Sequence, residues 1–216
     1  MTEFEFLQKY DSKFVKIDYL QTLDPDLHFI IKSYDGKITN YLKQQKPGEK
    51  IWIKGPVGLG LGLTKKSFGN FVGFSAGTGI NAFLDLLHFF AHKKICKTYG
   101  NDLYSDDEIE FYNRTLNDFN LTLFIAFKDA RSAYGMKHIM AAAEIYPERV
   151  RVFINVSDIT DFEKLYPLAR SKLVNRFDEE IIRKYVPRDA KKIFFSGSAI
   201  FNNKIGDYLE SVGFNQ

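Results

Sequence analysis

A glycine-rich turn between an apolar run and an amphipathic segment is the part of this chain best suited to hold a charged ligand. Residues 71–74 are apolar, and Ser75-Ala76-Gly77-Thr78-Gly79 follows them. The next apolar side chains fall on one helical stripe: Ile80, Phe83, Leu84 and Leu87. A buried strand that runs through such a turn into a helix presents backbone N–H groups to a phosphate, and glycine lets the ligand approach closely. The same pattern is equally typical of a tight strand-to-helix turn without a ligand.

Polar residues also follow the next apolar run, residues 121–127. Lys128, Asp129, Arg131 and Ser132 stand there, and an open parallel sheet binds its ligand at the carboxyl ends of its strands. Arg131 is therefore placed to contact a ribose or a phosphate. The alternative interpretation is a solvated turn at Lys128 and Asp129, with Ser132 as the N-cap of a helix.

Three potential metal ligands recur at four-residue intervals: His88, His92 and Cys96. On a helix the first and the last of them lie about 12 Å apart, which is too far to share one ion. We therefore predict no metal site. The two histidines are expected on a solvated helix face, and Cys96 is expected to be a semi-buried structural thiol.

Composition excludes several classes of protein. The 216 residues are 45% hydrophobic and 26% charged, with a formal net charge of +3, which is ordinary for a globular protein and too weakly basic to indicate a nucleic-acid partner. A single cysteine rules out an internal disulfide. We find neither a targeting signal at the acidic amino end nor an apolar run of about 20 residues. We therefore expect an intracellular protein without a transmembrane segment, either soluble or part of a large assembly.

The elements that must position these residues fall into two parts. Residues 1–66 are predicted to be rich in strands (14–19, 27–32 and 50–54), with a short helix at 40–44. From residue 67 to 216, strands at 71–74, 121–127, 150–156 and 192–195 alternate with helices at 81–94, 133–145, 178–185 and 199–212. This alternation predicts a parallel sheet in an α/β domain. The long connection 95–120 contains a helix N-terminus signal at Ser105-Asp106-Asp107-Glu108 and is interpreted as a surface helix or a docking element.

The order of the motifs resembles the ferredoxin–NADP reductase superfamily, and most closely its cytochrome b5 reductase branch. Along the chain these motifs are Gly36-Lys37-Ile38-Thr39, then Gly48, then residues 53–58, then Ser75-Ala76-Gly77-Thr78-Gly79-Ile80, and finally Phe195-Ser196-Gly197-Ser198. The resemblance implies an antiparallel flavin-type β-barrel in residues 1–66, followed by an α/β nicotinamide-binding domain in residues 67–216. It also implies FAD and NADH as the cofactors.

The resemblance assigns roles to residues at matching positions. Gly36, Ile38 and Thr39 match the turn that holds the FAD pyrophosphate. Gly77, Thr78, Gly79 and Ile80 match the segment that lies against the nicotinamide and its phosphates. Ser196 and Gly197 match a pair beside the nicotinamide, so Thr78 and Ser196 become the catalytic candidates. Asp158 matches an acidic residue that meets the adenosine ribose and disfavours a 2′-phosphate; its alternative role is a turn or helix cap.

The chain also departs from this family. The family's Arg-x-Tyr-Ser/Thr strand is not preserved in residues 15–20, where no register keeps all three groups. Thirteen residues precede Phe14, too few for the strands that the family's barrel places there. A truncated barrel leaves unpaired strand edges, so we expect another chain or another copy to cover it.

Two functions remain open at this stage. The first is an oxidoreductase that passes electrons from NADH through FAD to a redox protein acceptor. The second is a diverged module, weakly active or inactive, that serves as a structural or regulatory subunit of a larger assembly. The glycine turns favour the first function, and the truncated barrel together with the insertion at 95–120 favours the second.

Overall fold

The computed structural model describes residues 31, 35–52 and 60–214. The chain divides into two compact units, Met1–Leu59 and Gly60–Gln216. The boundary expected from the sequence, between residues 66 and 67, lies a few residues further along the chain. None of the described helices combines the length and the apolar character needed to cross a bilayer.

In the first unit, the described residues form one helix, α3 (Lys37–Gln44), which begins earlier than the expected helix at 40–44. The strand expected at 50–54 is not found in its described part, since Lys50, Ile51 and Trp52 form neither strand nor helix and Trp52 is fully exposed. The strand expected at 14–19 and most of that at 27–32 lie outside the described residues, and Ile31 belongs to no strand. The flavin-type barrel therefore stays a prediction.

The second unit is built on a four-stranded sheet whose strands all run parallel, as the alternation of elements predicts. Its strands are β1 (Gly69–Ala76), β2 (Phe119–Phe127), β3 (Val150–Val156) and β4 (Lys192–Ser196). Their order is β3-β2-β1-β4, so β1 lies in the middle and pairs with both β2 and β4. The chain thus adds β2 and then β3 on one side of β1, and it adds β4 on the other side.

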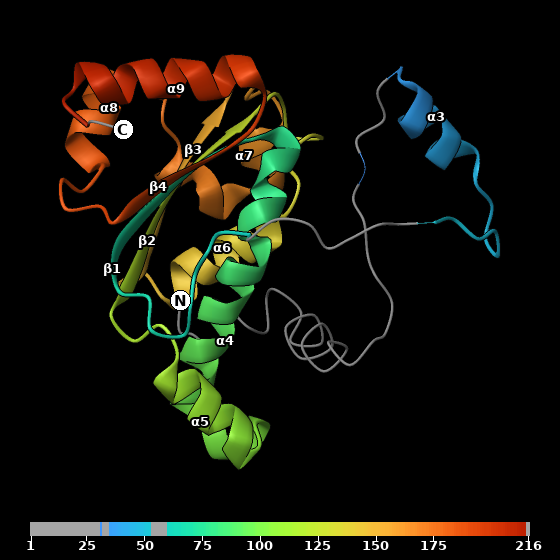
Figure 1. The fold of residues 1–216 in the computed structure, drawn as a ribbon. Helices are drawn as coiled ribbons and strands as arrows, with labels where there is room; N and C mark the ends of the chain where they lie inside the picture. Colours follow the sequence, from blue (N-terminus) through green and yellow to red (C-terminus); the bar gives the residue numbers. More distant parts are fainter. Residues whose placement is uncertain (1–30, 32–34, 53–59, 215–216) are drawn as a thin grey trace. The chain divides into compact units, whose positions relative to one another are not determined.

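Helices cover both faces of this sheet (Figure 1). Against one face pack α4 (Asn81–Leu103) and α6 (Met136–Ile145), together with α7 (Phe162–Leu165) and the 3-10 helix η3 (Pro167–Lys172). Against the other face pack α8 (Glu179–Tyr185) and α9 (Ala199–Ser211). The result is a three-layer α/β/α unit, in which the sheet separates two apolar clusters.

Aromatic rings hold the strands together across the sheet. On the α9 side the rings of Phe153, Phe124, Phe74 and Phe195 stack in that order, with centroids 5.0, 4.6 and 6.0 Å apart. Each strand contributes one ring, so the stack runs through the whole strand order β3-β2-β1-β4. Offset stacking of this kind adds to the burial of apolar surface, and it fixes the register in which the strand ends meet.

The insertion at 95–120 lengthens α4 and adds a further helix, α5 (Asp106–Arg114), at the far end of α4 (Figure 1). The expected helix at 81–94 was too short, because helical structure continues to Leu103 across a non-helical residue at Tyr99. The predicted start of α5 is confirmed. The Ser105 hydroxyl accepts from the backbone of Glu108, and the Glu108 carboxylate accepts from the backbone of Ser105, which makes a capping box.

A buried lysine joins α4 to the end of α5. The Nζ of Lys93 donates hydrogen bonds to the carbonyl oxygens of Tyr112 and Thr115 and to the side-chain oxygen of Asn117. Burial lowers the pKa of Lys93 to about 8, so the group still carries its proton at neutral pH. A cation is favoured at this position because the C-terminus of α5 is the negative end of its dipole.

His92 is the second buried polar residue of this region. Its Nδ1 lies 2.7 Å from the hydroxyl of Tyr104, and the residue is 2% exposed. The expectation of a solvated histidine is therefore wrong for His92, because Tyr104, just after the end of α4, packs against it. Cys96 is buried and free, as expected of a structural thiol. Among the described residues no cluster of metal-ligating side chains is found.

We predict that Lys93→Met destabilises the protein by about 2 kcal/mol, because two buried carbonyl oxygens and the Asn117 side chain lose their donor at once. The free energy of unfolding in urea measures this loss. The matched control is Lys97→Met on the exposed side of the same helix, which should change the free energy by less than about 0.5 kcal/mol. Equal effects of the two substitutions would contradict the anchoring role of Lys93.

Acid should weaken the fold through His92. Burial, with a smaller contribution from nearby His88, lowers the pKa of His92 from 6.5 to about 3. Between these values the unfolded chain binds a proton that the folded protein does not, so stability falls as the pH drops below 6.5. Between pH 7 and pH 5 this amounts to about 2 kcal/mol. In His92→Gln, the pH dependence of the unfolding free energy should shrink by that amount; an unchanged slope would refute the assignment.

Candidate functional site

The loops that follow the four strands gather at one edge of the sheet. Because the strands are parallel, their carboxyl ends face the same side. The loop after β1 is Gly77–Ile80, and those after β2 and β3 are residues 128–135 and 157–161. After β4 only Gly197 and Ser198 separate the strand from α9. The four segments in which the sequence places its candidate residues of this unit are therefore brought together.

The turn after β1 is a short 3-10 helix, η2 (Gly77–Ile80), that continues directly into α4. Gly77 has a φ of +55°, which residues other than glycine rarely adopt. Apart from its chain neighbours, no atom of the described residues lies within 4 Å of the position that a Cβ would occupy. Thr78 is half-buried, and Ile80 is fully buried in the core. A ligand at this turn can therefore contact Ile80 only through its backbone.

Gly79 has a different reason to be glycine. A Cβ at this residue would lie 1.8 Å from the carbonyl oxygen of Ser196, so the turn packs directly on the backbone at the end of β4. Gly197 is similarly close to Ala76 at the end of β1, with 3.0 Å between its Cβ position and the Ala76 Cβ. The two glycine-containing segments named from the sequence are therefore neighbours. They meet between β1 and β4, where the direction of strand addition reverses.

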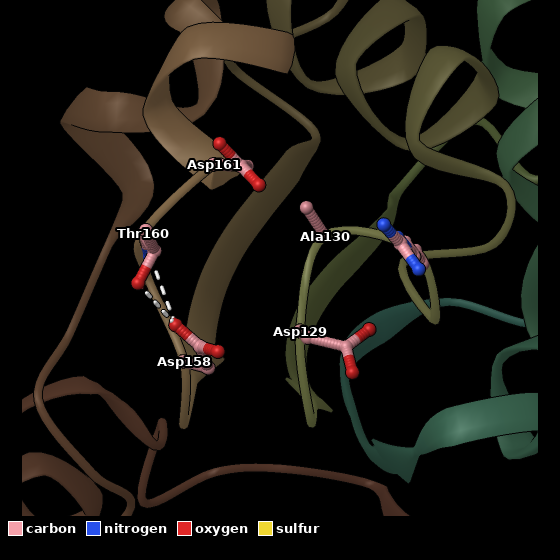
Figure 2. Close-up of a pocket in the computed structure, with 6 residues that line it drawn as sticks. Asp129, Ala130, Asp158, Thr160 and Asp161 are labelled. Carbon is pink, nitrogen blue, oxygen red and sulfur yellow. Dashed lines mark hydrogen bonds between the residues drawn. The ribbon is translucent and has the colours of Figure 1, made fainter.

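A cavity of about 270 Å³ lies at the same edge, between the loops that follow β2 and β3 (Figure 2). It is lined by Asp129, Ala130, Arg131, Asp158, Thr160 and Asp161. Both hydrogen bonds between Asp158 and Thr160 are made by Oδ1 of the carboxylate, at 3.1 Å to the backbone nitrogen and 2.6 Å to the hydroxyl. Asp158 thus forms the turn cap that was one of its two expected roles, and it also lines a cavity.

The cavity is acidic. Hydrogen bonds from the Thr160 hydroxyl and backbone hold the pKa of Asp158 below its usual value, and the backbone N–H of Ser132 does the same for Asp129. Both carboxylates are ionised at neutral pH, and Arg131 is the one cation among the lining residues. Such a cavity suits a neutral group rich in hydroxyls better than a phosphate.

Ser132 does not cap a helix, contrary to one expectation. Its hydroxyl hydrogen-bonds to the backbone of Asp129, and its own N–H donates to the Asp129 carboxylate at 2.8 Å. α6 begins only at Met136, after Gly135. Helix α6 therefore starts later than the helix expected at 133–145, because Asp129 and Ser132 close a turn of their own.

The flavin candidates Gly36, Ile38 and Thr39 lie at the start of α3 in the first unit. Gly36 precedes the helix without a side-chain cap, and the side chain of Ile38 is exposed. The hydroxyl of Thr39 donates to the carbonyl oxygen of Gly36 at 3.2 Å. The helix N-terminus offers backbone N–H groups to a pyrophosphate, but Asp35, which hydrogen-bonds Asn40, adds a competing negative charge beside it.

The described residues of the second unit fit a dinucleotide in two places. The space at Gly77 and the N-terminus of the helix behind it suit phosphates, and the acidic cavity suits a ribose. Sequence reasoning did not identify Thr160 and Asp161 as parts of the site, since both follow β3 as ordinary loop residues. Their position directly after the predicted strand was the available signal.

Comparison with known proteins identifies the fold. No protein-family model matches the chain, and no curated protein matches it either. Among solved structures, the cytochrome b5 reductase domain of Ulva prolifera nitrate reductase superimposes with a TM-score of 0.53 at 14% identity, covering 84% of this chain and 63% of that domain. A mutant of the ferredoxin-NADP+ reductase from Plasmodium falciparum, in complex with 2′P-AMP, matches at a TM-score of 0.38 and 16% identity, over 82% of this chain and 62% of that one.

Where the two superimpose, the chain thus has a fold like that of this cytochrome b5 reductase domain, in agreement with the resemblance of its motifs. It spans less than two thirds of the length of the reductase domain that it matches. At this level of identity the likeness establishes the fold alone.

The two glycines of the turn should respond differently to substitution. Gly79→Ala places a Cβ against backbone at 1.8 Å, so we expect a loss of stability above about 3 kcal/mol, since neither strand end can move freely. In Gly77→Ala the added Cβ has open space beside it. The loss of stability is then only that of holding alanine in a left-handed conformation, about 1 kcal/mol. Denaturant unfolding of both variants measures the difference, and equal losses would refute the packing role of Gly79.

Proposed function

We propose that the protein is an NADH-dependent flavin oxidoreductase of the cytochrome b5 reductase type, which passes electrons through FAD to a protein acceptor. The observation that carries the proposal is the pairing, at one sheet edge, of an open glycine turn with an acidic cavity. One fits the phosphates of a dinucleotide and the other fits its adenosine ribose. The likeness of fold to a b5 reductase domain supports the same assignment.

In this proposal, the Gly77–Ile80 turn binds the dinucleotide by backbone N–H groups. Thr78 and Ser196, whose segments meet where β1 and β4 end, flank the nicotinamide and orient its ring with their hydroxyls. Gly197 keeps the chain beside Ala76 narrow, so that the ring can enter. The residues of this chain thus bind and position the nicotinamide, and they exclude water from it.

Asp158 then selects NADH over NADPH. Its Oδ1 is occupied by the two hydrogen bonds from Thr160, which leaves Oδ2 to accept from the ribose hydroxyls. A 2′-phosphate in the cavity would meet the ionised carboxylates of Asp158 and Asp129. Repulsion between like charges therefore favours the cofactor without that phosphate.

The flavin belongs to the first unit in this proposal. Gly36, Ile38 and Thr39 would hold the FAD pyrophosphate at the N-terminus of α3, through backbone N–H groups and the Thr39 hydroxyl. When bound, FAD supplies hydride acceptance from NADH and single-electron donation to the acceptor. We also propose that a partner chain covers the barrel edge.

A second candidate function is a structural or regulatory subunit that retains only the nucleotide domain in working order. Two observations favour it. The Thr39 hydroxyl is engaged by the carbonyl of Gly36, and Asp35 lies near the same helix end. The α4–α5 extension is also held by its own buried polar contacts, far along α4 from the carboxyl edge.

The experiment is a titration of the purified full chain with FAD, NADH and NADPH. We expect a flavin absorption band that bleaches on addition of NADH, and tighter binding of NADH than of NADPH. Asp158→Asn should narrow that preference by about fivefold, because one pair of like charges costs on the order of 1 kcal/mol near a surface. The matched control is Asp107→Asn on α5, outside the cavity.

The outcomes separate the two functions. NADH binding without flavin uptake would favour the subunit that retains the nucleotide domain. If the protein takes up neither FAD nor NADH, both the oxidoreductase and the nucleotide site are refuted.

A further inference from the structure

Ser75 carries a buried hydroxyl whose purpose the fold alone does not explain. The residue is fully buried, and its Oγ has no hydrogen-bond partner among the described residues. It stands near the end of β1, in a strand that is otherwise apolar apart from Asn70. A buried hydroxyl without a partner lowers the stability of the fold, since it loses its bonds to water and gains none.

Its position links it to the glycine turn. Gly73, two residues earlier, faces α4, because a Cβ there would meet the ring of Phe83 at 2.6 Å. Alternate residues of a strand share a face, so Ser75 also points to the side of the sheet that α4 covers. It is in register with Ser196 of β4 and precedes Gly77–Ile80 by two residues. The hydroxyl therefore lies where the turn, β1 and β4 come together.

The turn is the element here that can rearrange. It is a 3-10 helix, whose hydrogen bonds are less favourable than those of an α-helix. Gly77 has open space beside it, whereas Gly79 is in contact with β4. The space beside Gly77 therefore leaves room for that part of the turn to shift while Gly79 stays against β4.

We propose that Ser75 is a positioning residue for the dinucleotide: when a ligand occupies the Gly77–Ile80 turn, the turn moves and hydrogen-bonds the Ser75 hydroxyl. This inference rests on the proposed function, because it requires that the turn bind a nucleotide. The side chain does not touch the ligand, since it is buried. The Ser75 hydroxyl has no partner among the described residues without ligand and gains one when the ligand is bound. This difference favours the ligand-bound arrangement of the turn.

The test compares Ser75→Ala with Thr115→Val in the full chain. Thr115 also has a buried hydroxyl without a partner among the described residues, but it follows α5, away from the carboxyl edge. Both substitutions should raise the melting temperature of the unliganded protein. Only Ser75→Ala should weaken NADH binding, by about fivefold, which is the worth of one neutral hydrogen bond.

Adenosine serves as the second probe, because its ribose fits the cavity between the loops after β2 and β3 and it has no phosphate to engage the turn. Its affinity should be the same in wild type and Ser75→Ala. Ser75→Cys, which keeps the shape but weakens the hydrogen bond, should lose NADH affinity as Ser75→Ala does and guards against a folding defect of the alanine variant.

Three results would overturn the inference. Unchanged NADH affinity in both Ser75 variants would refute the role of the hydroxyl and leave the proposed function intact. An equal loss for NADH and adenosine would indicate a general defect rather than action through the turn. If the wild-type protein binds neither probe, the proposed function itself fails, and the role of Ser75 fails with it.

Discussion

The contact between Gly79 and the Ser196 carbonyl group is the constraint on which the candidate site depends. No side chain fits between them, because a Cβ at Gly79 would lie 1.8 Å from that oxygen. The turn after β1 is thereby held against the end of β4, and Gly197 is held against Ala76. Glycine at residue 79 allows this close packing, whereas glycine at residue 77 leaves space for a ligand. One short motif therefore serves both the fold and the candidate site.

The remainder of the second unit supports this junction. Stacked phenylalanine rings run through all four strands on one face, and the apolar sides of α4 and α6 fill the other. The packing of the apolar clusters on the two faces of the sheet determines where the strand ends lie, and therefore where the loops after them lie. Polar chemistry is confined to those loops, with a neutral glycine turn above β1 and an acidic cavity above β2 and β3. In the proposed function, the glycine turn takes the phosphates of a dinucleotide and the cavity takes its ribose.

The α4–α5 extension is organised by different interactions. Lys93 binds acceptors at the end of α5, and His92 contacts Tyr104. Both residues are buried, and these contacts satisfy the Nζ of Lys93 and the Nδ1 of His92 within the protein. The extension is therefore an integral part of the fold rather than a loosely attached loop, and its polar anchors lie apart from the sheet edge that carries the site.

Local sequence determined the strand–turn–helix units. The apolar run before Gly77, the runs that became β2 and β3, and the capping box at Ser105 and Glu108 were all predictable, because neighbouring residues alone specify them. Only the tertiary structure decided which of these residues meet. It buried His92 and Lys93 of α4 against Tyr104 and the end of α5. It also turned Ser132 away from a helix cap and paired Asp158 with Thr160 at a cavity that residues after two different strands form. Such contacts depend on packing between segments distant in the chain, and no local pattern encodes them.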